Sequence, residues 1–407
     1  MPWLEWLSLF VRWFHVIAGV AWIGASFYFI WLDNSLREPP QQKKDQGIKG
    51  DLWAIHGGGF YEIAKYAHGP QTMPEKLHWF KWEAYSTWLS GMALLILVYY
   101  FGASAYLIDP SVQALSPLQA VLFGLGFIAI GFGVYEIACR SPLGQYPTVF
   151  GVALALFITF TCWLAAHLFS GRGAYIHVGA LVGTIMVANV FLVIMPSQRK
   201  MVHAVSNNEP IDPAWGAGAK LRSVHNNYFT LPLLFIMISN HYPQTYQHDM
   251  NWLVLALLMA VSAWIRHFFN LKHHGVIRPA ILVSGFLAML AIAVWVSWPK
   301  ASFSSEHNAK TTIEETQQES SLVSVQKMTD QQERIENLIA THCRSCHSAT
   351  PTSELFKVAP LGVVLDNWQD ISRYKAQIIH RTTVTRDMPF LNKTGMTDAE
   401  RQILSKW

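Results

Sequence analysis

Residues 148–170 read Thr148-Val-Phe-Gly-Val-Ala-Leu-Ala-Leu-Phe-Ile-Thr-Phe-Thr-Cys-Trp-Leu-Ala-Ala-His-Leu-Phe-Ser170, and no charged side chain interrupts them. An α-helix rises about 1.5 Å per residue, so a stretch of this length can cross the hydrocarbon core of a bilayer, about 30 Å thick. Of the 407 residues, 52% are hydrophobic and only 14% are charged. This composition is typical of an integral membrane protein, and we expect most of the chain to lie in a lipid bilayer.

Similar apolar runs predict an all-α helix bundle with about eight membrane spans. They lie near residues 7–32, 84–107, 117–138, 148–170, 174–196, 228–240, 251–268 and 276–298. The sixth run is the weakest, because its apolar part from Tyr228 to Ser239 is short and contains Pro232. A proline interrupts helical hydrogen bonding, so this segment is expected to be kinked or re-entrant. Seven spans are the alternative.

Basic residues in the loops predict the orientation of these spans. The loops 33–83, 139–147, 197–227 and 266–278 hold seven, one, four and three Lys and Arg residues, whereas the loops 108–116, 171–173 and 241–250 together hold only Arg172. Lys and Arg are enriched in the cytoplasmic loops of membrane proteins. The first set is therefore expected in the cytoplasm. Both chain ends are expected on the periplasmic side of a bacterial inner membrane.

A second kind of sequence appears at Cys343-Arg-Ser-Cys346-His347, which is the C-x-x-C-H pattern of covalent c-type haem attachment. The two thiols can each add to a haem vinyl group, and the histidine can then ligate the iron. A zinc half-site is disfavoured because the chain has no second C-x-x-C. In bacteria such haem is attached outside the cytoplasm, which agrees with the orientation predicted from the loops.

The second axial ligand of this haem is predicted to be Met388. It lies about 40 residues after the motif, and a thioether is a usual sixth ligand in c-type cytochromes. Met396 is the alternative. It directly precedes Thr397-Asp-Ala-Glu400, which predicts a capping box at the start of the last helix, so Met396 is expected to be a packing residue.

The domain organisation follows from these two parts. Residues 1–299 are predicted to form the membrane domain, and residues 329–407 a small periplasmic class I cytochrome c domain. Residues 300–328 are rich in Ser, Glu, Gln and Thr, which is typical of a flexible linker.

The tail from residue 300 holds 13 basic and 13 acidic side chains, so the net charge of +4 belongs to the membrane part. No basic tract suggests nucleic-acid binding. Cys139 and Cys162 have no motif spacing and are expected to be inert thiols.

Histidines in the outer halves of the spans predict a second haem, of b type. The candidate iron ligands are His15 together with His177 or His167, because an ionisable residue inside a span usually marks a functional site. Arg12 lies three residues before His15 and shares its helix face, where it could contact a haem propionate. The alternative is that each histidine is a structural residue bonded to a neighbouring carbonyl.

A weak internal repeat relates the two halves of the membrane domain. Ile176-His177-Val178-Gly-Ala-Leu-Val182 can be aligned with Phe14-His15-Val16-Ile-Ala-Gly-Val20. This predicts two four-helix halves, with functional sites at the repeat interface.

Polar residues that enter the second and sixth spans are candidates for a substrate site or a proton relay. The candidate catalytic residues are Glu83, Tyr85, His225 and Asn227. The alternative is that they cap helix starts at the membrane surface.

Taken together, these stretches resemble the bacterial integral-membrane urate oxidase (urate hydroxylase) family with a C-terminal cytochrome c domain. The similar stretches are Arg12-Trp-Phe-His-Val-Ile-Ala-Gly-Val-Ala-Trp-Ile-Gly24, Lys81-Trp-Glu-Ala-Tyr-Ser-Thr-Trp88, Gly183-Thr-Ile-Met-Val-Ala-Asn-Val190 and His225-Asn-Asn-Tyr-Phe-Thr-Leu-Pro232. The resemblance implies oxidation of urate to 5-hydroxyisourate, with electrons passing to the c haem and on to a soluble cytochrome c or a terminal oxidase. From the residues alone, a non-catalytic subunit that carries electrons between quinol and cytochrome c remains the alternative.

Overall fold

The computed structural model describes residues 2–110, 112–273, 275–298, 318–353, 359–384 and 386–407. These residues form two compact units. The first unit contains Met1–Gly102 and Val121–Val296, and the second contains Ala103–Ala120 and Ser297–Trp407.

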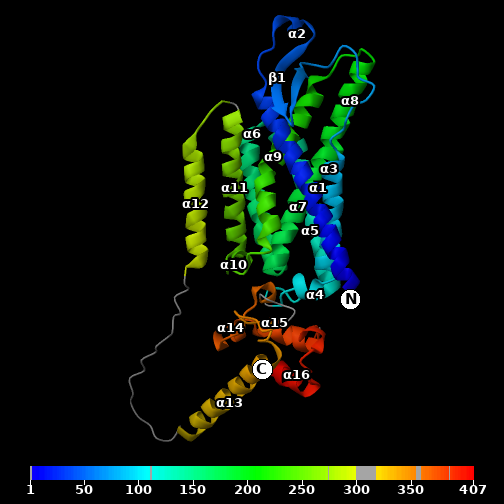
Figure 1. Ribbon diagram of the computed structural model, residues 1–407. Helices are drawn as coiled ribbons and strands as arrows, with labels where there is room; N and C mark the ends of the chain where they lie inside the picture. Colours follow the sequence, from blue (N-terminus) through cyan, green and yellow to red (C-terminus); the bar gives the residue numbers. More distant parts are fainter. Residues whose placement is uncertain (1, 111, 274, 299–317, 354–358, 385) are drawn as a thin grey trace. The chain divides into compact units, whose positions relative to one another are not determined.

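Long helices that run alongside one another build the first unit (Figure 1). They are α1 (Pro2–Ser35), α3 (Trp82–Leu94) continued by the π-helix η1 (Leu95–Tyr100), α5 (Pro117–Arg140), α6 (Pro147–Leu168), α7 (Gly171–Ala188) continued by the π-helix η3 (Asn189–Ile194) and α8 (Met195–Ser206), α9 (Pro213–Ser239), α11 (Asn251–His273) and α12 (Pro279–Ser297). Short connections of this unit contain α2 (Gln41–Asp45), the 3-10 helix η2 (Pro142–Gln145) and α10 (Pro243–Tyr246), whereas α4 (Ala103–Tyr106) belongs to the second unit.

Within the described residues, six helices are long and apolar enough to cross a membrane. The predicted second and sixth spans, which correspond to α3 with η1 and to α9, are not among them. Helix α9 is 27 residues long and includes Pro232, but its first half carries Lys220 and Arg222. Polar residues therefore lower the mean hydropathy of this helix. The count of eight spans remains a prediction.

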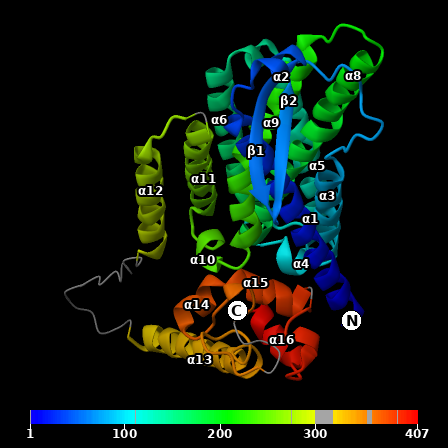
Figure 2. The same ribbon diagram turned by 45° about the horizontal axis from the view of Figure 1, so that its top comes forward.

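The prediction of an all-α fold is wrong for residues 48–66. Strands β1 (Ile48–His56) and β2 (Gly59–Tyr66) form an antiparallel hairpin, which Figure 2 shows. Gly57 and Gly58 have φ angles of +58° and +83°, which a tight hairpin turn requires. The glycine run between two segments rich in aromatic and branched residues is a hairpin signal that the analysis of apolar runs missed.

The second unit contains short helices around one long helix. They are α13 (Gln318–His342), η4 (Pro360–Gly362), α14 (Trp368–Arg373), α15 (Lys375–Ile379), the π-helix η5 (His380–Val384), η6 (Phe390–Asn392) and α16 (Asp398–Ser405). Helix α13 begins within the segment predicted as a linker. The remaining part of that segment, residues 300–317, lies outside the described residues.

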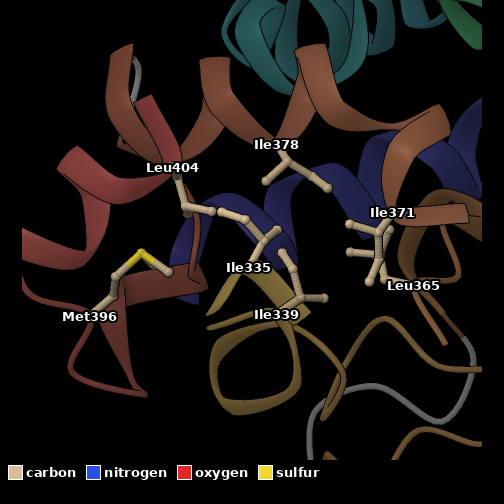
Figure 3. Packing of buried hydrophobic residues seen from close by; sticks show 7 residues of the cluster. All are labelled: Ile335, Ile339, Leu365, Ile371, Ile378, Met396 and Leu404. Carbon is tan, nitrogen blue, oxygen red and sulfur yellow. The ribbon is translucent and has the colours of Figure 1, made fainter. Parts of the chain in front are cut away.

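Buried apolar side chains hold the second unit together (Figure 3). Ile335 and Ile339 of α13 pack with Leu404 of α16 and with neighbours from α14 and α15. Met396 belongs to this cluster and is only 3% exposed, so its predicted packing role is confirmed. The predicted capping box is also present, because Thr397 and Glu400 bond to each other's backbone N–H at the start of α16.

Candidate functional site

The C-x-x-C-H motif forms a tight turn directly after the last residue of α13. The N–H of Cys343 donates to the carbonyl oxygen of Ile339 at 2.9 Å, which continues the helical hydrogen bonding. The N–H of His347 donates to the carbonyl oxygen of Cys343 at 2.8 Å. Both Cys343 and Cys346 are free thiols. The turn thus brings the two thiols and the imidazole close together in the chain, as covalent attachment to one haem requires.

The imidazole of His347 is oriented by its backbone surroundings. Its Nδ1 atom lies 3.0 Å from the carbonyl oxygen of Val363, so Nδ1 carries the proton and donates it. The Nε2 atom therefore keeps its lone pair, which is the arrangement of iron-ligating histidines. Burial lowers the pKa of His347, which favours the neutral imidazole that ligation needs.

The backbone around Met388 is fixed from both sides. The N–H of Met388 donates to the carbonyl oxygen of Arg381 at 3.2 Å, and the guanidinium of Arg401 donates to the carbonyl oxygen of Met388 at 2.9 Å. Arg401 also donates to the carbonyl oxygen of Thr382. The side chain of Met388 is half-buried, whereas that of Met396 belongs to the buried apolar cluster of the second unit. Two thiols, an imidazole with a free Nε2 and a thioether are the donor set that a c-type haem uses, and Met388 as the distal ligand remains a prediction.

The first unit contains a cavity of about 450 Å³, within the usual range for small-molecule sites. Helix α1, the segment 68–80, η3 with α8, and α9 enclose it. The lining residues are Trp22, Ile23, Ala25, Ser26, Phe29, His68, Gly69, Pro70, Met73, Leu77, His78, Trp79, Phe80, Met186, Val190, Ile194, Gln198, Met201, Val202, Val205, Ser223, Asn226 and Thr230. Most aromatic rings of the lining come from α1 and the 68–80 segment, and polar side chains come from α8 and α9, together with Ser26, His68 and His78.

One face of α9 supplies the polar wall of the cavity. Ser223, Asn226 and Thr230 are three and four residues apart, so they lie above one another on that helix. Asn226 is 7% exposed, and its amide is held at both ends. Its Nδ2 donates to the carbonyl oxygen of Met186 at 2.9 Å, and its Oδ1 accepts from Asn189 at 2.8 Å. This wall is therefore organised before a ligand binds.

A buried polar network continues behind Asn226. Asn189 donates to the Tyr135 hydroxyl at 2.9 Å, and that hydroxyl lies 2.8 Å from Nδ1 of His225. Arg222 donates to Oδ1 of Asn189 at 3.0 Å and pairs with Glu136 at 2.9 Å. Asn189 is the first residue of the π-helix η3, and π-helical turns are frequent at functional sites.

Of the four predicted catalytic residues, Asn227 contacts the cavity lining through its backbone carbonyl oxygen, which accepts from Thr230, and Glu83 approaches the lining through its side chain. Its Oε1 lies 4.0 Å from Nε2 of His78, and its Oε2 is buried without a hydrogen-bond partner among the described residues. His78 itself is exposed.

The other three predicted residues point elsewhere. Tyr85 contacts the ring of Phe191, and His225 stacks on Phe150. Asn227 donates to Asn270 on α11. Successive helical residues differ by about 100° in direction, so His225 and Asn227 flank the face that Asn226 presents to the cavity.

The three histidines predicted to ligate a b haem share one tautomer. Nδ1 of His15 lies 3.0 Å from the carbonyl oxygen of Thr87, and Nδ1 of His167 lies 2.8 Å from that of Trp163. Nδ1 of His177 lies 2.8 Å from the carbonyl oxygen of Gly173. Each therefore keeps a lone pair on Nε2, as an iron ligand must.

The three histidines differ in how closely other residues pack around their imidazole rings. His177 is fully buried, and its Nε2 lies 3.4 Å from the Tyr100 hydroxyl. A Cβ at Gly124 would approach that nitrogen to 2.5 Å, so the ring lies directly against α5. His177 as packed leaves no room for iron, whereas half-buried His15 and exposed His167 do not show this obstruction. Arg12 is exposed. The b haem remains a prediction, and no reaction step below depends on it.

Several residues of the cavity and its network were not singled out from the sequence. Asn189 and Tyr135 lie inside apolar runs, and only their polarity within a span could have drawn attention to them, whereas Arg222 lies in the predicted loop 197–227. His68 and His78 fall in a segment without helical periodicity, so the sequence gives no signal that it covers a cavity.

The structure thus defines a class of protein: a bundle of membrane-length helices with a polar-walled cavity, in one chain with a small helical unit that carries a C-x-x-C-H motif. The family model of the urate oxidase N-terminal domain matches residues 2–297, so the chain belongs to that family. No curated protein shows a significant match, and no solved structure does.

Proposed function

We propose that the protein is a membrane-bound urate oxidase that converts urate to 5-hydroxyisourate and passes the electrons to a c-type haem of its own second unit. The single observation that carries this proposal is the combination of a urate oxidase family domain with a C-x-x-C-H motif in one chain. A soluble cytochrome c or a terminal oxidase then receives the electrons.

The reaction balances without direct use of dioxygen. Urate and one water molecule give 5-hydroxyisourate, two protons and two electrons. The new C–O bond takes its oxygen from water. A c-type haem, when bound, would accept one electron at a time, so each urate would need two successive transfers through it, with the soluble cytochrome c or terminal oxidase removing the first electron before the second arrives. Cys343 and Cys346 would hold it covalently, and His347 with Met388 would set its axial ligation.

The cavity of the first unit is the proposed urate site. Urate is a planar heterocycle with several donors and acceptors along its edge. The rings of Trp22 and Trp79 offer apolar faces for such a molecule, and Asn226 and Gln198 offer amide groups. Asn226 is pre-oriented by Asn189 and Met186, which limits the entropy lost on binding.

Glu83 is the proposed general base. Its unpaired, buried Oε2 is a free acceptor near the cavity-lining His78, so it can take a proton from the attacking water. The imidazole of His78 lies beside the other oxygen and can share that proton. Tyr85, His225 and Asn227 lie outside the cavity lining and are proposed to support the walls.

The proposed orientation places the cavity toward the cytoplasm and the second unit in the periplasm. The cavity is lined by residues from the 68–80 segment and from α8, which belong to the Lys- and Arg-rich loops. In this arrangement urate enters from the cytoplasmic side.

Product stoichiometry tests the proposal. Membranes that contain the wild-type chain and a physiological acceptor should form 5-hydroxyisourate without matching hydrogen peroxide. A chain with Cys343→Ala and Cys346→Ala should lose this turnover, and a small artificial electron acceptor should restore it. Peroxide formed one-for-one with urate, together with full activity of the cysteine variant, would contradict the proposal. No urate turnover under any condition would favour a purely electron-carrying subunit.

A further inference from the structure

The hairpin of β1 and β2 presents large apolar side chains on its surface. Trp53, Ile55 and Phe60 are 63%, 68% and 79% exposed. Successive side chains of a strand point to opposite faces, and Ile55 lies directly opposite Phe60 in the register. These three residues therefore share one face near the turn. Large apolar side chains gathered in this way usually mark a surface that contacts a partner or a membrane.

The charged residues of this face lie away from the turn. Residues 54–61, which include the turn, contain no Asp, Glu, Lys or Arg. The carboxylates of Asp51 and Glu62 lie nearer the base of the hairpin, and the ammonium group of Lys43 pairs with both. Lys43 also lies 5.9 Å from the centre of the Trp53 ring. The face is thus ion-paired at its base and apolar at its turn, with a tryptophan at the boundary.

The base of the hairpin is fixed at the end of a helix of membrane-spanning length. Helix α1 is long and apolar enough to cross a bilayer, and it ends at Ser35. Arg37 and Asp51 exchange two backbone hydrogen bonds of 2.9 and 3.1 Å. Lys65 of β2 pairs with Asp33, in the last turn of α1, at 2.6 Å. These contacts tie both strands to the point where α1 ends.

The same end of α1 carries the side chains expected at a membrane surface. Tyr28, Phe29 and Trp31 are all exposed, and tyrosine and tryptophan are enriched where a bilayer meets water. In both Figure 1 and Figure 2 the strands run from α2 back toward the level of the long helices. The turn is therefore directed toward the level of the spans and not away from it.

We propose that residues 53–61 form an interfacial membrane anchor, in which Trp53, Ile55 and Phe60 enter the headgroup region of the bilayer beside α1. A phospholipid surface is favoured over a protein partner because the hairpin is tied to a lipid-facing helix and directed toward the level of the spans. The outer edges of a two-stranded sheet keep unpaired backbone N–H and C=O groups, so the anchor stays in the hydrated interface. This docking is independent of the substrate and of which side of the membrane holds the loop.

Photo-cross-linking of the full chain, in the membranes of the cells that express it, identifies what the turn contacts. Phe60→benzoylphenylalanine introduces an aromatic photo-cross-linker at the turn. Glu75→benzoylphenylalanine is the matched control, because Glu75 is an exposed residue of the same loop. After illumination, mass spectrometry should find phospholipid adducts on the peptide with position 60 and none at position 75. Adducts to a second copy of the chain or to another protein, or no phospholipid adduct at position 60, would overturn the proposal.

A second pair of variants shows whether the apolar face, and not the cross-linker itself, holds the turn at the lipid. Ile55→Asp places a carboxylate opposite position 60 on the same face. It should remove most of the phospholipid adduct at position 60, because an ionised group is expensive to bring into an apolar phase. Ile55 is exposed, so its replacement leaves no cavity in the helix bundle. Gln71→Asp adds the same charge at an exposed position of the loop and should leave the adduct unchanged. An undiminished adduct in Ile55→Asp would contradict the anchor.

Discussion

The guanidinium of Arg401 donates to the carbonyl oxygen of Met388 at 2.9 Å, and so ties the last helix to the residue predicted to be the distal haem ligand. Arg401 is only 7% exposed. The contact fixes the backbone of Met388. The side chain of Met388 is half-buried and does not belong to the buried apolar cluster of the second unit. Met396, eight residues later, is instead packed among the isoleucines of α13 and α15.

These different surroundings predict different outcomes for the two methionines. Met388→Ala should abolish the weak near-infrared sulfur-to-iron band of the oxidised c haem, because the axial thioether is lost. Met396→Ala should keep the band and lower the free energy of unfolding by about 2 to 5 kcal/mol, because it leaves a cavity in the core. Near-infrared absorption and thermal unfolding of both variants provide the measurements. The reverse pattern would assign the ligand role to Met396.

Glu400 makes the stability of the second unit depend on pH. The N–H and hydroxyl of Thr397, together with His342 at 3.3 Å, lower the pKa of Glu400 to about 2. A depressed carboxyl pKa contributes stability above the ordinary carboxyl pKa of about 4.3, and this contribution disappears as the pH falls toward 2. Unfolding of the second unit should therefore become easier between pH 5 and 2.

Glu400→Gln isolates the charge, since glutamine can also complete a capping box. The melting temperature of this variant should be lower than that of the wild type at neutral pH and should converge with it near pH 2. Equal pH dependence in the two proteins would show that the Glu400 charge contributes nothing.

Glu83 should affect the chemical step more than substrate binding. Glu83→Gln keeps the shape of the side chain but removes its basicity, so kcat for urate should fall about 10²- to 10⁴-fold. The KM should change little. Glu75→Gln is the matched control, because Glu75 is an exposed carboxylate of the loop before α3. A Glu83→Gln enzyme with normal kcat would exclude this residue as the base.

The predicted b haem can be detected once the covalent haem is absent. The full chain with Cys343→Ala and Cys346→Ala should still show a b-type spectrum in a pyridine haemochrome assay. His15→Ala should remove that signal, whereas His177→Ala should not, because the Nε2 of His177 packs against Tyr100 and α5. A colourless, well-folded cysteine variant would mean that the histidines are structural.

Helical periodicity, motif spacing and charge placement made much of the fold predictable. The capping box at Thr397 and the packing role of Met396 are local patterns, and the structure confirms both. The hairpin at residues 48–66 was missed because charged residues and glycines interrupt its apolar residues, although Gly57 and Gly58 signalled its turn.

The cavity was only partly predictable for a different reason. Asn226 lies between the predicted His225 and Asn227, and Thr230 follows three residues later, but the direction of a side chain depends on which helices pack around α9. Such relationships cannot be read from one sequence, because they join residues that are distant along the chain.

The most direct test of the central claim is anaerobic reduction of the c haem by urate. Membranes that contain the oxidised full-length protein are mixed with urate in the absence of oxygen, and the absorbance of the reduced c haem is followed. The account predicts that urate reduces the haem, that 5-hydroxyisourate forms at one molecule per two electrons, and that Glu83→Gln slows this reduction. A haem that stays oxidised with urate but is fully reduced by dithionite would contradict the claim.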